Sequence, residues 1–401
     1  MAHPNGKKRL LVLASTFPAR LDDGVPAFVY DIAEQEAEDF EVTVLTPRVP
    51  GAATRETMGA VTVIRFPYFP RRWEDLADGA ILDNLRARRS RWLQVVPLLI
   101  GQMRAIRREV ARSRPDAIHA HWVIPQGMSA VLVAPSVPLL VTTHGGDIYA
   151  LNNAIFGRIK RRVLRTAKAV TTVNAEMISR LEEWGVDEAK LSLLPMGVPL
   201  DQAAEAKAGA VQVPGRLLVV GRLVEKKGIG VLLDALRNNV DAEGWSLVIV
   251  GDGPIRAELE AASAGLPVEF RGQQSREEVL GEMAAASVLV LPSVSAASGD
   301  QEGLPVVLLE AAAMGSAIVA SDLPGINEAL TNEKNGLLVP QRDAAALGRA
   351  LTRLLGDTTL RERLGAAALE RADDYSLARI GAGYRAVVAG ISSPGMPNHV
   401  D

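Results

Sequence analysis

The sequence predicts an α/β protein in which two doubly wound domains face one another across a cleft. Its 401 residues exceed what a single hydrophobic core usually serves, so two domains of about 150 to 200 residues are expected. Short apolar, β-branched runs alternate with helical patterns, which is typical of βαβ units and parallel sheets. This alternation occurs twice, once in each half of the chain.

The expected strands are short runs rich in Val, Ile, Leu and Ala. In the first half they cover residues 9–14, 41–46, 61–65, 117–120, 139–143 and 169–173. In the second half they cover residues 217–220, 246–250, 268–270, 288–291, 317–320 and 336–339. Helical patterns between most of these runs return the chain for the next parallel strand.

The interval between the two sets predicts the domain boundaries. Residues 199–214 are rich in Ala and carry no strand pattern, so we expect them to link a domain of residues 1–198 to a domain of residues 215–375. A last helical pattern at 376–390 is followed by no strand and is expected to pack back onto the first domain. Ligands of open α/β sheets bind outside the carboxyl ends of the strands, which predicts a catalytic cleft between the domains.

Composition excludes several classes of protein. Hydrophobic residues make up 48% of the chain and charged residues 23%, as expected of a globular protein with a sizeable core. The chain has no cysteine, which excludes a disulfide scaffold, a thiol nucleophile and iron–sulfur ligation. The first apolar run, at 10–14, is too short for a secretory signal, and no later run is a credible spanning helix, so a cytoplasmic location is expected.

Charge differs between the halves of the chain. Residues 1–200 carry 26 Lys and Arg against 21 Asp and Glu, whereas residues 201–401 carry 18 against 26. This asymmetry predicts separate surfaces for different partners. Nucleic acid is not an expected partner, because aromatic residues make up only 4% and no basic stripe with interleaved aromatics is present.

Residues 86–114 contain nine arginines around the apolar run 92–100. The arginines and the apolar residues fall on different faces of a helix. One interpretation is a solvated surface helix with a stripe that joins the core. The other is a basic amphipathic segment that makes peripheral contact with the inner face of an anionic membrane.

The loop 221–228 is the first candidate site, because it lies between an expected strand and an expected helix. Backbone N–H groups and the positive end of a helix make such a loop a natural anion site. Arg222 and Lys227 add a planar fork and a mobile ammonium group, which suit two adjoining phosphates. The alternative is a solvated charged turn in which Glu225 pairs with Lys226.

Two glutamates, Glu302 and Glu310, form the second candidate site. Glu302 is expected at the mouth of the cleft, where Gly303 allows a ligand to approach the backbone. Glu310 lies in an apolar helical pattern, where an ionised carboxylate without partners would cost several kcal/mol. Two ribose hydroxyls would satisfy it. A buried arginine or a helix cap would do so equally well.

Histidines mark the third candidate site. His144 and two glycines follow an expected strand, which puts a titratable group beside the cleft. His119 and His121 are expected on opposite faces of their strand, so a metal site from that pair is not expected. The chain contains no Asp-x-Asp motif, which argues against a carboxylate–metal cradle. It also lacks a Walker loop, a Gly-x-Ser-x-Gly elbow and a Gly-x-Gly-x-x-Gly after its first strand.

The combined motifs resemble one family. The chain reads GRLVEKKG at 221–228, GDGP at 251–254 and EGLP at 302–305, and Glu310 follows. In this order and spacing they resemble the retaining glycosyltransferases of family 4, which have the GT-B fold of two Rossmann-like domains. Further matches at 17–18, 119–122, 144–147 and 195–198 extend the likeness over nearly the whole chain. Two departures are Asp23, where the family often has Gly, and Met196, where it often has Asn.

The resemblance implies a role for each candidate residue. Arg222 and Lys227 would hold the donor diphosphate, and Glu302 would accept from hydroxyls of the transferred sugar. The remaining implied donor contacts are Glu310 with the ribose, Gly303 and Leu304 with sugar or phosphate, Gly272 and Gln273 with the base, and Gly24 with the diphosphate. His144 would lie near the sugar as a positioning and electrostatic group, and Asp23 and Asp147 are assigned to the acceptor side.

The implied activity is transfer of a hexosyl or N-acetylhexosaminyl unit from a nucleotide sugar, a UDP-sugar in particular, to a hydroxyl acceptor. A glycan, a lipid-linked glycan and a small metabolite are candidate acceptors. No metal or other cofactor is expected, since fixed cations can stabilise the departing diphosphate. Two alternatives are a GT-B-like nucleotide-sugar epimerase or hydrolase and a non-catalytic subunit that binds a nucleotide sugar.

Overall fold

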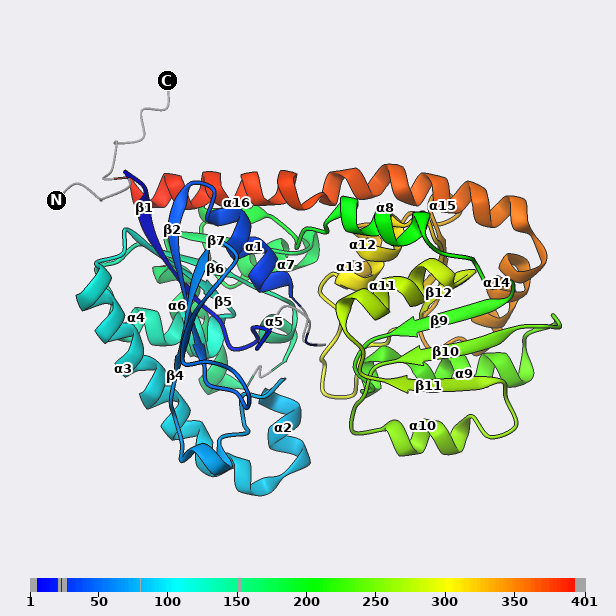
Figure 1. Ribbon diagram of the computed structural model, residues 1–401, viewed down its shortest axis with the longest axis horizontal. Coiled ribbons are helices and arrows are strands. Elements are labelled where there is room, and N and C mark those ends of the chain that lie inside the picture. Colours follow the sequence, from blue (N-terminus) through cyan, green and yellow to red (C-terminus); the bar gives the residue numbers. More distant parts are fainter. Residues whose placement is uncertain (1–5, 21–22, 24–26, 80, 151–152, 394–401) are drawn as a thin grey trace.

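A computed structural model describes residues 6–20, 23, 27–79, 81–150 and 153–393. The first domain is built on an eight-stranded sheet with the order β3-β4-β2-β1-β5-β6-β7-β8 (Figure 1). Its strands are β1 (Lys8–Leu13), β2 (Phe40–Pro47), β3 (Arg55–Met58), β4 (Val61–Phe66), β5 (Ala117–His121), β6 (Leu139–Thr142), β7 (Ala169–Thr172) and β8 (Leu191–Leu193). Neighbouring strands are parallel except β3, which pairs antiparallel with β4.

The second domain has a six-stranded parallel sheet with the order β11-β10-β9-β12-β13-β14. Its strands are β9 (Arg216–Val220), β10 (Ser246–Val250), β11 (Val268–Gly272), β12 (Val288–Leu291), β13 (Ala317–Ser321) and β14 (Leu337–Val339). In both sheets the strand order changes direction beside the first strand of the domain, as in doubly wound folds. The predicted α/β architecture of two Rossmann-like domains is therefore confirmed.

Each predicted strand is present, with ends that differ by no more than two residues. Two edge strands, β3 and β8, were not predicted. Arg55–Met58 is short and mostly polar, and Leu191–Leu193 has only three residues, so neither has the apolar run that identified the others. Both lie at the outer edges of the sheet, where one side of the strand needs no partner.

Helices connect the strands. In the first domain they are α1 (Phe28–Glu36), α2 (Ile81–Ala87), α3 (Val95–Ser113), α4 (Met128–Val133), α5 (Gly146–Tyr149), α6 (Ala154–Thr166) and α7 (Ala175–Glu183). The later helices are α8 (Leu200–Ala208), α9 (Ile229–Asn238), α10 (Arg256–Ala262), α11 (Arg276–Ala285), α12 (Val306–Ala313), α13 (Pro324–Asn327), α14 (Ala344–Gly356), α15 (Thr358–Ala372) and α16 (Leu377–Ser392). Within the described residues, no helix is both long enough and apolar enough to cross a bilayer.

Two chain crossings join the domains. The interval 199–214 is largely helix α8, which packs on α11 and α12 of the second domain. The chain returns through α15 and α16, which run along one side of both domains (Figure 1), and α16 packs on α1, β5 and β6 of the first domain. The crossings are tied together, since Val198 N–H donates to Tyr375 O at 2.9 Å and Leu377 N–H donates to Val198 O at 2.9 Å.

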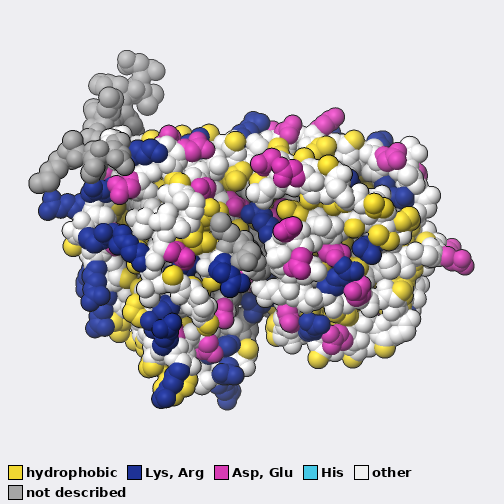
Figure 2. Space-filling model, viewed as in Figure 1, with side chains coloured by type: hydrophobic (Ala, Val, Ile, Leu, Met, Phe, Trp, Pro, Cys, Tyr) yellow, Lys and Arg dark blue, Asp and Glu magenta, His cyan; other side chains and the backbone are white. Residues whose placement is uncertain are grey.

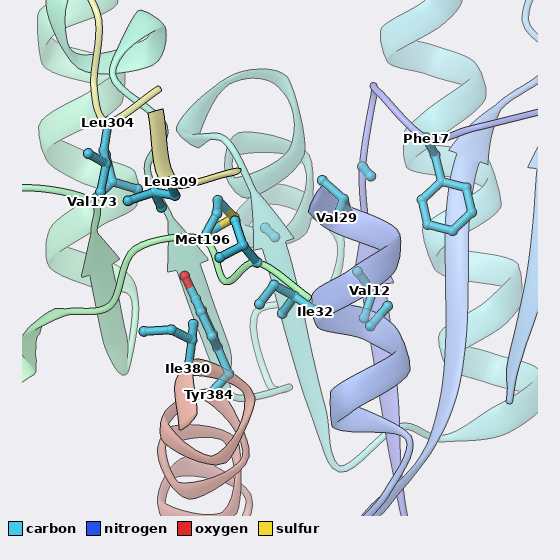
Figure 3. Packing of buried hydrophobic residues seen from close by; sticks show 14 of the residues in the cluster. Val12, Phe17, Val29, Ile32, Val173, Met196, Leu304, Leu309, Ile380 and Tyr384 are labelled. Atoms are coloured by element: carbon cyan, nitrogen blue, oxygen red, sulfur yellow. The ribbon is translucent and has the colours of Figure 1, made fainter. Parts of the chain in front are cut away.

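One buried apolar cluster extends across the domain boundary (Figure 3). Leu304 and Leu309 of the second domain belong to the same cluster as Val173 of the first. Tyr384 of α16 is fully buried there, and its hydroxyl donates to Leu194 O at 2.8 Å. The loop that carries Glu302 is therefore anchored to both domains through its neighbour Leu304.

Candidate active site

The loop 221–228 leaves β9 at its carboxyl end and leads directly into α9. Its last residue, Gly228, has a φ of 63°, and a Cβ atom there would lie 1.8 Å from Pro292 O, so only glycine fits. The loop after β12 packs closely here, because Val294 N–H donates to Lys226 O at 2.8 Å. This packing places Lys226 and Lys227 against the segment that carries Glu302.

Lys227 and Glu302 form a buried ion pair. Lys227 Nζ lies 3.0 Å from Glu302 Oε1, and the two side chains are 15% and 9% exposed. Burial alone would raise the pKa of Glu302. The ammonium groups of Lys227 and Lys226 outweigh it and hold that pKa below its ordinary value. Glu302 is therefore an ionised acceptor at neutral pH, which suits binding of hydroxyl groups.

The other charges of this loop have partners on neighbouring segments. Lys226 Nζ lies 3.3 Å from Asp300 Oδ2, and Glu225 Oε1 accepts from Ala297 N–H at 3.0 Å. Arg222 faces the first domain, where its Nη1 lies 3.7 Å from the position of a Cβ atom on Gly79. Glu225 and Lys226 thus bond the segment that follows β12, and the alternative of a charged turn closed by a Glu225–Lys226 pair is not observed.

His144 follows β6 and meets the loop that carries Glu302. A Cβ atom on Gly145 would lie 2.9 Å from Gly303 N, and one on Gly303 would lie 2.8 Å from His144 O, so the two backbones touch. Asn174 Nδ2 also donates to Gly303 O at 2.7 Å. The structure thus brings His144, Gly303, Glu302 and Lys227 together at the domain boundary. Figure 2 shows a notch between the two domains on one side of the molecule.

The His144 ring lies among other rings. Its centroid is 4.6 Å from that of Trp122, 5.3 Å from that of Phe28 and 5.2 Å from that of His121. Burial, with a contribution from His119, lowers the pKa of His144 to about 3. The ring is therefore neutral at physiological pH, which favours a positioning role over proton donation by an imidazolium.

His119 and His121 were predicted on opposite faces of their strand, and this is wrong. Their ring centroids lie 4.2 Å apart, and both side chains are fully buried. Residues two apart in a strand point to the same face, which the prediction overlooked. His119 Nδ1 bonds Glu36 Oε1 at 2.7 Å, and His119 Nε2 bonds Thr142 Oγ1 at 2.7 Å. Among the described residues, no three His, Asp or Glu side chains are grouped so that they could hold a metal ion.

Glu310 lies in α12 and is partly buried. Burial raises the pKa of Glu310, the Arg276 guanidinium opposes this rise, and the Asp31 carboxylate adds to it. Arg276 Nη1 itself donates to Asp31 Oδ1 at 3.0 Å and Oδ2 at 3.1 Å, which joins α11 to α1 across the boundary. A buried arginine was one of the expected partners of Glu310. Arg276 is close enough to act on Glu310 electrostatically, but the hydrogen bonds of Arg276 go to Asp31.

The resemblance also assigns donor contacts to Gly272, Gln273, Leu304 and Gly24, which lie in different parts of the chain. Gly272 ends β11 with a φ of 68°, and its carbonyl accepts from Gly251 N–H at 2.7 Å. Gln273 follows it and is exposed. Leu304 is buried in the shared cluster, so its side chain has a packing role. Gly24 lies outside the described residues.

The two aspartates that the resemblance assigns to the acceptor side both accept from backbone N–H groups. Asp147 accepts from His144 N–H at 2.9 Å and from Val123 N–H at 3.0 Å, so it holds the two loops together. Asp23 accepts from Ala19 N–H and, at 3.1 Å, from Arg20 N–H within its own loop.

Sequence reasoning missed Asn174, Arg276 and Asp31. Asn174 follows β7 and caps α7, so the rule that ligand-facing residues follow the carboxyl ends of strands could have identified it. Arg276 and Asp31 are separated by 245 residues, and nothing in the spacing signals their contact.

The chain matches two family profiles. Residues 214–357 match the family described as "Glycosyl transferases group 1", and residues 23–197 match the "Glycosyl transferase 4-like domain". The phosphatidyl-myo-inositol mannosyltransferase of Mycobacterium leprae is 30% identical over 88% of this chain and 89% of its own length. The chain spans about half the length of other curated relatives of 31–36% identity, whose matched segments cover 44–61% of each protein.

Solved structures share the fold. Sucrose-phosphate synthase from Thermosynechococcus elongatus superposes with a TM-score of 0.75 at 23% identity, covering 96% of this chain and all of that one. Anabaena HepE, solved in complex with UDP and glucose, superposes with a TM-score of 0.69 at 16% identity over 95% of this chain and 99% of its own. The matched profiles and the mannosyltransferase relative show that the chain belongs to the group 1 glycosyltransferases, family 4, with the GT-B fold.

Proposed function

We propose that this protein is a retaining glycosyltransferase that moves a hexosyl or N-acetylhexosaminyl unit from a UDP-sugar to a hydroxyl acceptor. The observation that carries this proposal is the buried Lys227–Glu302 pair, whose neighbour Gly303 contacts the backbone of the His144 loop across the domain boundary. The complex of HepE with UDP and glucose supports a uridine donor. A glycan, a lipid-linked glycan or a small metabolite would supply the acceptor hydroxyl.

In the proposed reaction, negative charge develops on the departing diphosphate. Cations fixed at that position stabilise the transition state more than the bound donor. Lys227 and Arg222 share one loop at the start of α9 and would supply these charges. Glu302 keeps the Lys227 ammonium in place before the donor binds, and it accepts from sugar hydroxyls once the phosphate takes over that ammonium.

The other residues would position the two substrates. His144 is neutral, so it would hydrogen-bond the sugar rather than protonate the leaving group. Glu310 would accept from the ribose hydroxyls. The acceptor hydroxyl would attack from the face that the diphosphate leaves, with a phosphate oxygen taking its proton, and no protein nucleophile is required.

Nucleotide binding tests the donor half of this proposal. In a thermal-shift panel of nucleotides and nucleotide sugars, UDP and one UDP-sugar should raise the melting temperature, because a ligand of the native state stabilises it by mass action. A matched pair of variants follows. Arg222→Ala with Lys227→Ala should abolish turnover, and Arg237→Ala, a surface change on α9, should leave it unchanged. Wild-type kcat/KM in the double variant would refute the assignment.

Acceptor dependence tests the transfer itself. A transferase releases UDP at a rate that rises with acceptor concentration. An epimerase or hydrolase would convert the UDP-sugar with no acceptor, and a non-catalytic subunit would bind UDP and release nothing with any acceptor. Retention is read from the anomeric configuration of the product by NMR. We also propose that no metal takes part, so a chelator should leave kcat unchanged.

The proposed partner of the first domain is an anionic membrane surface. The exposed face of η2 (Arg89–Gln94) and α3 carries large apolar side chains at Trp92, Leu93, Val96 and Ile100, and exposed Trp73 lies under the Arg72 guanidinium at 4.0 Å. Arg104, Arg107 and Arg108 continue that face and are exposed. Figure 2 shows basic side chains gathered over the first domain. Apolar side chains beside arginines suit the interface of anionic lipids.

Liposome sedimentation tests this partner. Vesicles with anionic lipid should sediment the protein at low salt and release it at high salt, because Debye screening weakens the attraction. Trp92→Ser with Val96→Ser should weaken binding with little effect on stability, since both side chains are exposed. Equal binding to neutral vesicles, or none at low salt, would refute the membrane proposal.

A further inference from the structure

A second histidine lies directly behind His144. His121 ends β5 and is fully buried, and its Nδ1 lies 3.1 Å from His144 Nε2. The two ring centroids are 5.2 Å apart with an interplanar angle of 22°. That separation is too large for rings in face-to-face contact and fits two rings joined edge to edge by the hydrogen bond between their nitrogens.

When both rings are neutral, the hydrogen bond between His121 Nδ1 and His144 Nε2 requires that one nitrogen carries a hydrogen and the other does not. Burial lowers the pKa of His121 well below its usual value and lowers that of His144 to about 3, so both rings are neutral at pH 7. One ring must therefore donate and the other accept. The direction of this bond decides which nitrogen of His144 holds a proton for the substrate.

The surroundings of His121 favour one direction. His121 Nε2 is buried and has no hydrogen-bond partner among the described residues. The His119 ring lies beside the His121 ring at an angle of 33°, but Glu36 and Thr142 occupy both nitrogens of His119. A proton on His121 Nε2 would be a buried N–H without an acceptor, which folded proteins rarely contain. The His121 proton therefore belongs on Nδ1, where His144 Nε2 accepts it.

We propose that His121 is a positioning residue that sets the tautomer of His144. His121 Nδ1–H donates to His144 Nε2, and His144 then carries its own proton on Nδ1. His144 Nδ1 becomes a hydrogen-bond donor for an oxygen of the sugar. This role in catalysis rests on the glycosyltransferase function proposed above, whereas the tautomer itself does not.

Charged and titratable groups around the pair leave the assignment intact. Glu36 of α1 bonds His119, Asp147 of α5 accepts from the His144 backbone rather than from its ring, and Tyr384 of α16 stacks on His119 and donates to a carbonyl. No carboxylate is hydrogen-bonded to the ring of His121 or His144 within the described residues, so neither ring has a partner that would make it an imidazolium.

Nitrogen-15 NMR of the free protein tests the tautomer directly. The chain has five histidines, so selective labelling gives few signals, which single substitutions assign. We expect His121 and His144 each to show a protonated Nδ1 and a bare Nε2, unchanged between pH 5 and 8. A proton on His144 Nε2 would overturn the proposal, whatever the activity of the enzyme.

Two isosteric variants test whether residue 121 sets the tautomer. In His121→Asn the side-chain amide can still donate from the position of Nδ1, so His144 should keep its proton on Nδ1 and kcat should stay within about threefold. In His121→Asp a carboxylate accepts instead, so the His144 proton should move to Nε2. Loss of one positioned donor then predicts a kcat about 100-fold lower. The new carboxylate should also raise the His144 pKa and add an ionisation to the pH profile.

Each outcome has one meaning. The melting temperatures of the two variants show whether both fold. Equal kcat in the Asn and Asp variants, or a proton that stays on His144 Nδ1 in the Asp variant, would overturn the role of His121. If no sugar transfer is found at all, the NMR result still decides the tautomer, and only the proposed function falls.

Discussion

Loss of the Lys227 ammonium should destabilise the second domain by leaving the Glu302 carboxylate buried and without its nearest partner. Lys227→Met keeps the length and apolar stem of the side chain and removes the charge. Breaking a buried ion pair by removal of one partner typically costs about 3–5 kcal/mol. Lys226 still acts on Glu302, so we expect about 2–3 kcal/mol. For a domain of this size, that loss lowers the melting temperature by roughly 4–12 °C.

The pH dependence gives a sharper test of the same pair. The pKa of Glu302 is lower in the folded protein than in the unfolded chain. The pair therefore stabilises the folded protein at pH values above the unfolded pKa. This stabilisation is lost as pH falls through the folded pKa. In Lys227→Met, burial dominates and raises the pKa of Glu302. The pH dependence of the free energy of unfolding then has the opposite sign. The ionised Glu302 carboxylate should destabilise the variant at neutral pH, and this destabilisation should decrease as pH falls.

Thermal and urea unfolding of wild type, Lys227→Met, Glu302→Gln and the double variant measure the coupling. The double variant should recover most of the lost stability, because it removes the unpaired charge. Lys226→Met is the matched control, with a smaller loss expected from its more exposed pair with Asp300. The reasoning fails if Lys227→Met unfolds within 1 °C of wild type at pH 7, or if its stability has the wild-type dependence on pH.

Three further changes probe the domain boundary. Arg276→Met should cost about 1–3 kcal/mol by leaving Asp31 buried without its guanidinium, and Asp31→Asn in that background should restore much of it in urea unfolding. Gly303→Ala should lower kcat and stability because its Cβ would lie 2.8 Å from His144 O, whereas Gly230→Ala, with no atom within 4 Å, should slightly stabilise α9. Glu310→Gln should weaken UDP binding by calorimetry, and wild-type affinity should fall as pH drops through the raised pKa of Glu310.

The fold and the donor loops could be predicted because their signals are local. A buried parallel strand needs a short apolar run, and such runs identified the central strands of both sheets. The loop 221–228 and the segment from Glu302 to Glu310 carry charged residues at strand ends, where the topology leads to the cleft. The edge strands β3 and β8 escaped prediction because an edge position requires less apolar sequence.

Contacts between distant segments could not be predicted in the same way. The Arg276–Asp31 pair and the backbone contact of Gly145 with Gly303 depend on how one domain rests on the other. The helix α8 appears in the interval 199–214 because α11 and α12 offer it a surface to cover. Local propensity says little about such a helix, since packing supplies most of its stability.

The order of residues along this chain determined two sheets and the loops that end their strands, because backbone pairing and burial follow from nearest neighbours. The tertiary structure alone decided which charges and which polar groups are paired. Lys227 pairs with Glu302 and Arg276 with Asp31, and the neutral rings of His121 and His144 share a hydrogen bond. Coulomb energies and hydrogen bonds depend on distances through space and on local burial, and residues far apart in sequence acquire both only when the domains pack.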